Sequence, residues 1–192
     1  MSCSVVQLIA GRGGDDPRGV TGSVSLARRD DLRILIDAGD PWNGSEIIAE
    51  LRKLSLCASD VTHVIITHGH VDHCANLLLF PFSTIIMDSD FVKKQSRHAP
   101  PDYSTIEEFP FQLSENIKIH KLRGHTHSDL LVEIFEEDGS TTMVCGDLIE
   151  SETDDGMELA VDKMQLEESQ RFIFSRADFI VPGHGKMFKS AH

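Results

Sequence analysis

The sequence predicts a layered α/β or α+β domain built on mixed sheets. Short apolar segments with the character of strands alternate with amphipathic helices, and several strands follow one another with only a turn between them. The 192 residues are 40% hydrophobic and 26% charged, so the chain can bury one core without disulfides or other staples. We therefore expect a single domain over residues 1–192.

The first half of the chain is predicted to be mostly strands. Its start has no basic segment and only a short apolar stretch, which indicates a first strand and not a signal peptide. Ser45 can cap a helix that runs to Leu54, because the apolar residues of that segment share one face. A loop is expected at 11–19 and a helical turn at 76–80. The expected strands are residues 1–10, 22–27, 32–37, 61–67 and 84–87.

The second half continues the alternation. A helix is expected at 166–175, and the strands are expected at residues 117–122, 130–135, 141–145 and 178–181. No apolar run is long enough for a transmembrane helix. The four cysteines are scattered and none forms a CxxC pair, which favours reduced thiols in a cytoplasmic or nuclear protein.

The sequence His68-Gly69-His70-Val71-Asp72-His73 directly follows an apolar strand. Imidazole and carboxylate are ligands for zinc, iron and manganese, and alternate residues of an extended segment point to the same side. A polar loop with unrelated histidines is the alternative, and four potential ligands at this spacing speak against it.

Three later residues repeat this placement. His125, Asp147 and His184 each come just after a predicted strand, with a glycine beside them. Glycine permits the sharp turns and close backbone approaches that such loops need. Each of these signals is weak alone, because a Gly-Asp pair is more often a turn than a ligand. With the first motif they place five histidines and two aspartates at strand ends.

This HxHxDH–His–Asp–His pattern resembles the metallo-β-lactamase superfamily, over residues 22 to 185. The resemblance implies a four-layer αββα sandwich with two mixed sheets. It implies one metal on His68, His70 and His125, and a second on Asp72, His73 and His184. Asp147 would bridge the two metals. Asp37, in Asp-Ala-Gly, would orient the ligand loops without touching a metal.

Such a site predicts a dinuclear hydrolase. Two divalent ions lower the pKa of a bridging water to about 7, and the resulting hydroxide attacks a phosphorus or a carbonyl. We expect zinc before iron or manganese, because no cysteine stands among the ligands. Asp72 would also orient the hydroxide. His127 lies in Arg-Gly-His-Thr-His, where the chain departs from the Pro-Gly-His usual in the family. We hypothesise that His127 is the acid that protonates the leaving group. The alternatives are a further metal ligand or a solvated side chain.

The substrate follows mainly from the resemblance. Several matching segments are similar to a small eukaryotic family member that acts as an endoribonuclease on histone pre-mRNA 3′ ends. From the spacing of the motifs we expect neither the inserted domain of larger RNA-cleaving relatives nor the helical C-terminal domain of glyoxalase II. A thioester or other small-molecule hydrolase, and a non-catalytic metal-binding protein, remain as alternatives. Nothing in the sequence decides between a monomer and a homodimer.

The charge of the chain complicates the RNA hypothesis. The formal net charge is −13, which disfavours generic binding to nucleic-acid phosphates and to anionic membranes. Lys93, Lys94 and Arg97 lie in the one compact basic stretch, 93–98, which could guide a phosphate backbone or simply end a polar helix. Trp42 and Tyr103 could rim the site or pack elsewhere. We therefore expect RNA binding that is weak and salt-sensitive.

Overall fold

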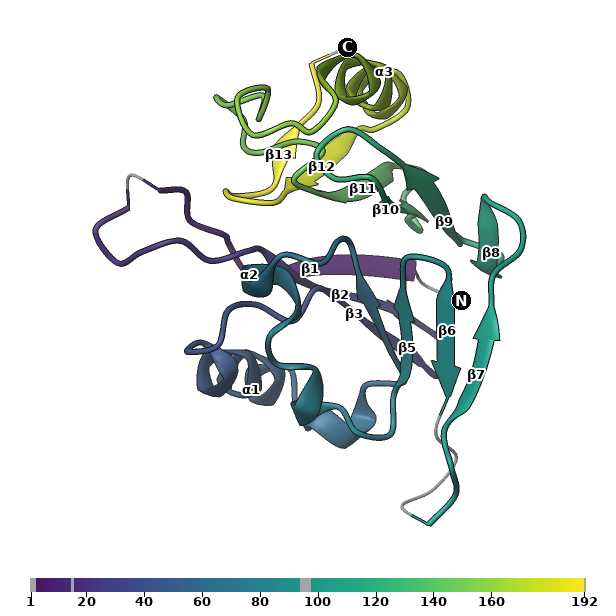
Figure 1. Cartoon of the computed structure of the whole chain (residues 1–192). Helices are drawn as coiled ribbons and strands as arrows, with labels where there is room; N and C mark the ends of the chain where they lie inside the picture. The colour runs from purple at the N-terminus through teal and green to yellow at the C-terminus, as the bar shows by residue number, and fades with distance from the viewer. Residues whose placement is uncertain (1–2, 15, 94–97, 192) are drawn as a thin grey trace.

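The protein is a sandwich of two mixed sheets, shown in Figure 1. Its computed structural model describes residues 3–14, 16–93 and 98–191. In spatial order the first sheet holds β1 Cys3–Ile9, β2 Val24–Arg29, β3 Leu32–Ile36, β4 His63–Ile66, β5 Thr84–Met87, β6 Asp90–Lys93 and β7 Asp102–Thr105. The second holds β13 Phe188–Lys189, β12 Phe179–Pro182, β11 Thr141–Gly146, β10 Asp129–Phe135, β9 Ile117–Leu122 and β8 Phe111–Ser114.

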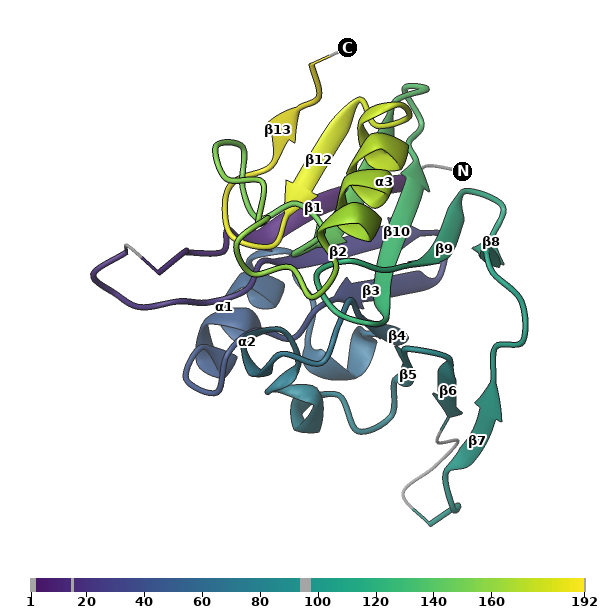
Figure 2. The ribbon, with the colours of Figure 1, turned by 45° about the horizontal axis from the view of Figure 1, so that its top comes forward.

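Helices cover the outer face of each sheet, as Figures 1 and 2 show. The described helices are α1 Gly44–Lys53, α2 Val71–Cys74 and α3 Lys163–Phe174, with 3-10 turns η1 Ala58–Asp60 and η2 Leu77–Leu79. Ile47 of α1 packs with Leu35 and Val64 of the first sheet, and Leu166 of α3 packs with Met143 of the second. The predicted αββα layering is therefore confirmed.

Alternation along the strands fills the space between the sheets. Ile34, Ile36 and Ile65 point from the first sheet toward Ile119 and Val132 of the second, and all five are fully buried. The neighbouring residues Leu35 and Val64 point the other way, onto the helices. Because side chains alternate across a strand, these almost continuous apolar runs indicate strands that are buried on both faces.

Several element boundaries differ from the sequence prediction. Helix α1 begins at Gly44 after Asn43, so Ser45 lies inside the helix and does not cap it. Helix α3 begins three residues early, because Asp162 accepts hydrogen bonds from the backbone of Met164 and Gln165. Strands β6, β7, β8 and β13 were not predicted. None of these four strands contains a buried residue, and β7 is exposed throughout. Only β8 alternates apolar and polar residues, and with four residues its pattern is too short to mark a strand.

Two residues whose place the sequence left open both lie in strands. Tyr103 lies in strand β7, and Lys93 ends strand β6, not a helix. Lys94 and Arg97 lie outside the described residues. Within the described part of the chain, no helix combines the length and the apolar character needed to cross a membrane.

Candidate metal centre

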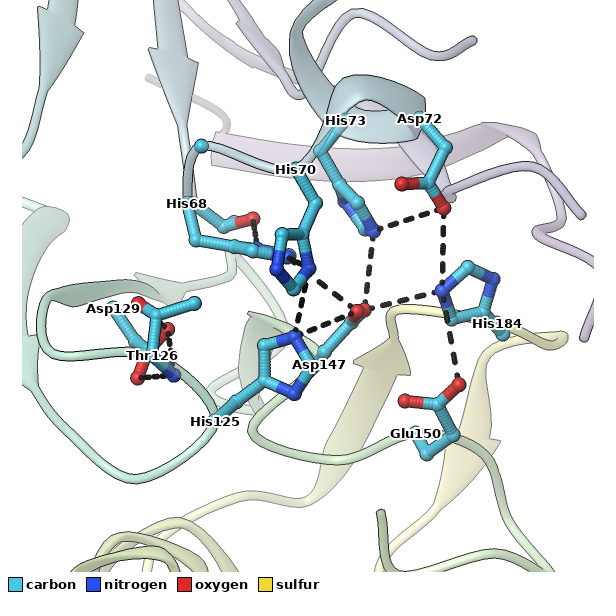
Figure 3. Close-up of polar contacts among 12 residues, drawn as sticks. His68, His70, Asp72, His73, His125, Thr126, Asp129, Asp147, Glu150 and His184 are labelled. Carbon is cyan, nitrogen blue, oxygen red and sulfur yellow. Dashed lines mark hydrogen bonds and ion pairs between the residues drawn. The ribbon is translucent and has the colours of Figure 1, made fainter. Parts of the chain in front are cut away.

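Four segments at one edge of the sandwich bring the predicted ligands together (Figure 3). The edge is where β4, β11 and β12 end and where β10 begins. A backbone hydrogen bond from Leu130 to the Thr67 carbonyl ties the two sheets together at this point. The assembled side chains are His68, His70, Asp72, His73, His125, Asp147 and His184.

The first set of donors consists of His68, His70, His125 and Asp147. His70 Nδ1 lies 3.0 Å from His68 Nε2 and 3.0 Å from His125 Nε2. Asp147 Oδ2 lies 3.4 Å from His68 Nε2 and 3.2 Å from His125 Nε2. Donors about 2.0–2.2 Å from one ion are separated by roughly 3.0–3.5 Å, so these four atoms have the spacing of a coordination shell.

The second set consists of Asp72, His73 and His184, again with Asp147. Asp147 Oδ1 lies 3.1 Å from His73 Nε2 and 3.4 Å from His184 Nε2. Asp72 Oδ2 lies 3.5 Å from His184 Nε2 and 3.8 Å from His73 Nε2. Asp147 thus turns one carboxylate oxygen to each set, which is the arrangement of a bridging ligand.

Hydrogen bonds on the far side of the rings set their orientation. His73 Nδ1 lies 2.8 Å from Asp37 Oδ2, and Asp37 also accepts from the backbone and hydroxyl of Thr67 at 2.7 and 2.9 Å. His184 Nδ1 lies 3.0 Å from the Arg12 carbonyl. When Nδ1 donates, Nε2 keeps its lone pair free, so these contacts select the tautomer that can bind a metal. The orienting role of Asp37 stays a prediction that these contacts support.

Backbone geometry at Asp37 and Gly183 shows how closely the site is packed. Asp37 has a φ of +63°, an uncommon conformation for a residue with a side chain and one that Asp and Asn tolerate best. At Gly183 an added Cβ would overlap Asp147 Oδ1. The loop that carries His184 can therefore pass beside the shared carboxylate only with glycine at this position.

The charges of the two sets differ. Burial alone would raise the pKa of Asp147, but its contacts with His184, His68 and His73 hold that pKa well below the usual range. Burial would lower the pKa of His184, but the neighbouring Asp147 carboxylate raises that pKa to about 9. In the first set, burial lowers the pKa of His125 to about 4. Near neutral pH the metal-free protein thus holds a proton on His184 but not on His125.

Two buried atoms of the second set have no hydrogen-bond partner among the described residues. They are His73 Nε2 and Asp147 Oδ1, which face each other without the geometry of a hydrogen bond. Unpaired buried polar atoms are costly, so they mark a place where another group belongs. Imidazoles that can give up their protons and carboxylates, all directed at one point, fit a divalent metal ion, and no thiolate is among them.

Two other predicted residues make no polar contact with these donors in the described part of the chain. His127 is exposed and shares no hydrogen bond or ion pair with any described residue of the two sets. Lys93 is near His63, where its charge helps lower the pKa of that histidine after the larger effect of burial. His63 begins the strand that ends before His68, so Lys93 lies at the opposite end of the sheet from the site.

The structure adds Glu150 and Asp129 to the site, neither of which was singled out in the sequence. Glu150 Oε1 lies 3.8 Å from His184 Nε2, and burial together with Asp147 raises the pKa of Glu150 to about 7. Asp129 accepts hydrogen bonds from the backbone and hydroxyl of Thr126, which holds the loop of His125. The Thr-x-x-Asp spacing could have indicated this loop, whereas an isolated glutamate gives no such signal.

Comparisons with known proteins agree with this geometry. A family model described as the metallo-beta-lactamase superfamily matches residues 17–184. The chain is 33% identical over 170 residues to metallo-beta-lactamase domain-containing protein 1 of Xenopus laevis, covering 88% of this chain and 72% of that protein. The human protein of that name is 32% identical over 180 residues, covering 91% of this chain and 66% of its own length.

Solved structures share the fold at low sequence identity. A Thermotoga maritima protein assigned to the metallo-beta-lactamases superposes with a TM-score of 0.75 and 17% identity, over 98% of this chain and 100% of that one. An N-acyl homoserine lactone hydrolase with its product bound at the catalytic metal centre superposes with a TM-score of 0.65 and 14% identity, over 95% of this chain and 92% of that one. At these identities the likeness concerns the fold alone.

Proposed function

The chain belongs to the metallo-beta-lactamase superfamily, and on that premise we propose that it is a dinuclear metal hydrolase that cleaves phosphodiester bonds in single-stranded RNA. Superfamily members are metal-dependent hydrolases. The observation that carries the proposal is Asp147, whose two oxygens face two separate donor sets. Zinc is the ion we favour, with iron or manganese as alternatives.

The residues of this chain would share the work of binding and orientation. Two ions held by the donor sets would supply Lewis acidity for the attacking and leaving oxygens. Asp37 and the Arg12 carbonyl select the ring tautomers of His73 and His184 whose Nε2 atoms can bind an ion. Asp72 is the half-buried member of the second set, where it could orient the attacking water. His127 stays the predicted acid for the leaving group.

RNA as the substrate is supported by the sequence resemblance to an endoribonuclease. The net charge of −13 opposes long-range attraction of RNA. Bound metal ions would reverse the local charge at the site, so we expect cleavage to depend on short-range contacts. Affinity should then fall as salt rises, with the small slope typical of few phosphate contacts.

A substrate panel tests the proposal. The purified chain is loaded with Zn²⁺, Mn²⁺ or Fe²⁺ and given single-stranded RNA, bis(p-nitrophenyl) phosphate, a thioester and a lactone. We expect metal-dependent cleavage of the two phosphodiesters, loss of cleavage in Asp147→Asn, and wild-type cleavage in the exposed-turn control Asp138→Asn. Metal analysis should find two ions per chain. For His127, unchanged turnover and pH profile in His127→Ala would contradict the acid role.

The acidic character of the protein favours a second candidate, a thioester or other small-molecule hydrolase at the same site. Efficient thioester or lactone cleavage without phosphodiester turnover would establish it and contradict the RNA proposal. A non-catalytic metal-binding role would be indicated by less than one bound ion per chain and no turnover of any substrate.

A further inference from the structure

A pocket of about 620 Å³ adjoins the second donor set. Its walls come from the loop between β1 and β2 and from the segment that leads into α1, and it reaches the site at Val71 and Asp72. The volume lies in the range of small-molecule sites, which is about 300–1,000 Å³. A group in this pocket would lie next to anything held at Asp72.

One wall of the pocket is an exposed indole. Trp42 is 86% exposed, although its backbone is fixed by a hydrogen bond of 2.7 Å to Asp40 Oδ1. Val20 and Val71, which also line the pocket, are exposed as well. Large apolar side chains that gather at an opening mark binding surfaces, and a flat indole presents a face for stacking.

A second wall offers an available cation. The carbonyl of Arg12 accepts from His184, so its backbone is tied to the donor set. Its guanidinium Nε donates to the Gly19 carbonyl at 3.2 Å, and the other two nitrogens have no hydrogen bond or ion pair with any described residue. Arg18, which also lines the pocket, is instead paired with Asp16 at 2.8 Å. Arg12 is therefore the arginine available to an anion.

The acidic residues that line the pocket already interact with other parts of the protein. Asp40 accepts hydrogen bonds from the backbone N–H groups of Trp42 and Asn43, and Asp72 belongs to the second donor set. Glu46 lies in the first turn of α1, where the helix dipole favours a carboxylate. The pocket thus combines one stacking face and one available guanidinium beside the metal ligands. A nucleotide presents the matching groups, a planar base and a phosphate.

We propose that this pocket holds the nucleotide next to the scissile phosphate of single-stranded RNA, with its base stacked on Trp42 and a backbone phosphate paired with Arg12. The inference rests on the proposed function and adds the substrate-recognition residues to it. Stacking on an aromatic side chain tolerates any base, so the pocket would bind RNA without strong sequence preference.

The single tryptophan of the chain gives a direct measurement. The metal-loaded full chain is titrated with a short phosphorothioate oligoribonucleotide that resists cleavage, and we expect saturable quenching of the Trp42 fluorescence. By anisotropy of labelled RNA, Trp42→Ala should bind about 10- to 100-fold more weakly, and Trp42→Phe should retain most of the affinity. Tyr103→Ala, which removes an aromatic side chain 70% exposed on β7, is the matched control and should bind like the wild type.

The salt dependence of RNA binding tests the role of Arg12. In Arg12→Ala the slope of log affinity against log salt should fall in magnitude by about 0.7, the value for one phosphate contact on a single strand. Unquenched fluorescence, or a Trp42→Ala affinity equal to that of Tyr103→Ala, would overturn the inference even if the enzyme cleaves RNA. Quenching without cleavage of native RNA would support the pocket and contradict the proposed activity.

Discussion

Replacing Asp37 by asparagine should weaken metal binding at the second donor set while leaving the fold in place. Asparagine has the same shape and also tolerates the φ of +63° at this position. Its oxygen can still accept from the Thr67 backbone, and the Thr67 hydroxyl can rotate to accept from the new NH₂ group. His73 has no such freedom, because its Nδ1 would now face a donor.

The expected magnitude follows from this tautomer. To accept from the new NH₂ group in Asp37→Asn, the neutral His73 ring must carry its proton on Nε2, the atom that faces Asp147 and the second set. A protonated Nε2 cannot bind a metal. Loss of an orienting partner typically lowers metal affinity 10- to 100-fold, which is about 1.4–2.7 kcal/mol. The first set should keep its affinity, because none of its histidines contacts Asp37.

A competition titration with a chromophoric chelator measures both affinities. Asp178→Asn is the control, since Asp178 also accepts a backbone N–H, from Thr141, at the other end of the second sheet. Circular dichroism of the metal-free variants checks that both are folded. Two metals bound to Asp37→Asn with wild-type affinity would refute the tautomer argument, and equal losses at both sets would show a general disruption.

Three further predictions concern packing, pH and the core. Gly183→Ala should bind fewer than two metal ions per chain, because the added Cβ displaces the Asp147 carboxylate. Gly185→Ala is the control and should keep both ions, because its Cβ meets only ordinary van der Waals contacts. Elemental analysis of both variants measures the difference. The metal-free fold raises the pKa of His184 from 6.5 to about 9, so its contribution to stability is complete below pH 6.5 and is lost as pH rises toward 9. A metal must displace that proton, so affinity at the second set should rise with pH over this window; chelator titrations that show no such rise would contradict the assignment. Ile65→Ala should lower the free energy of unfolding by about 2–5 kcal/mol in urea titrations because Ile65 is fully buried between the sheets, and the exposed Val71→Ala should change it little.

The sequence predicted the layers and most central strands because they are buried and their apolar pattern is local. It missed β6, β7 and β8, which have exposed or only half-buried side chains, so tertiary pairing and not composition makes them strands. Helix ends moved by one to three residues because capping depends on contacts such as that of Asp162 with Met164. These differences do not move the ligand loops.

The sequence alone predicted the candidate metal ligands, since HxHxDH is contiguous and each later candidate lies within three residues of the end of a predicted strand. The family resemblance implied how the donors divide, but only the tertiary structure gives the distances between them, because an Asp147 that faces both sets requires the ends of β4, β11 and β12 to meet at one edge. Strand register likewise put Lys93 at the far end of the sheet, and the loop after β1 brought Arg12 beside Trp42. The kinds of ligand are thus set by short stretches of sequence. The distances that bring those ligands into one site depend on how the two sheets align.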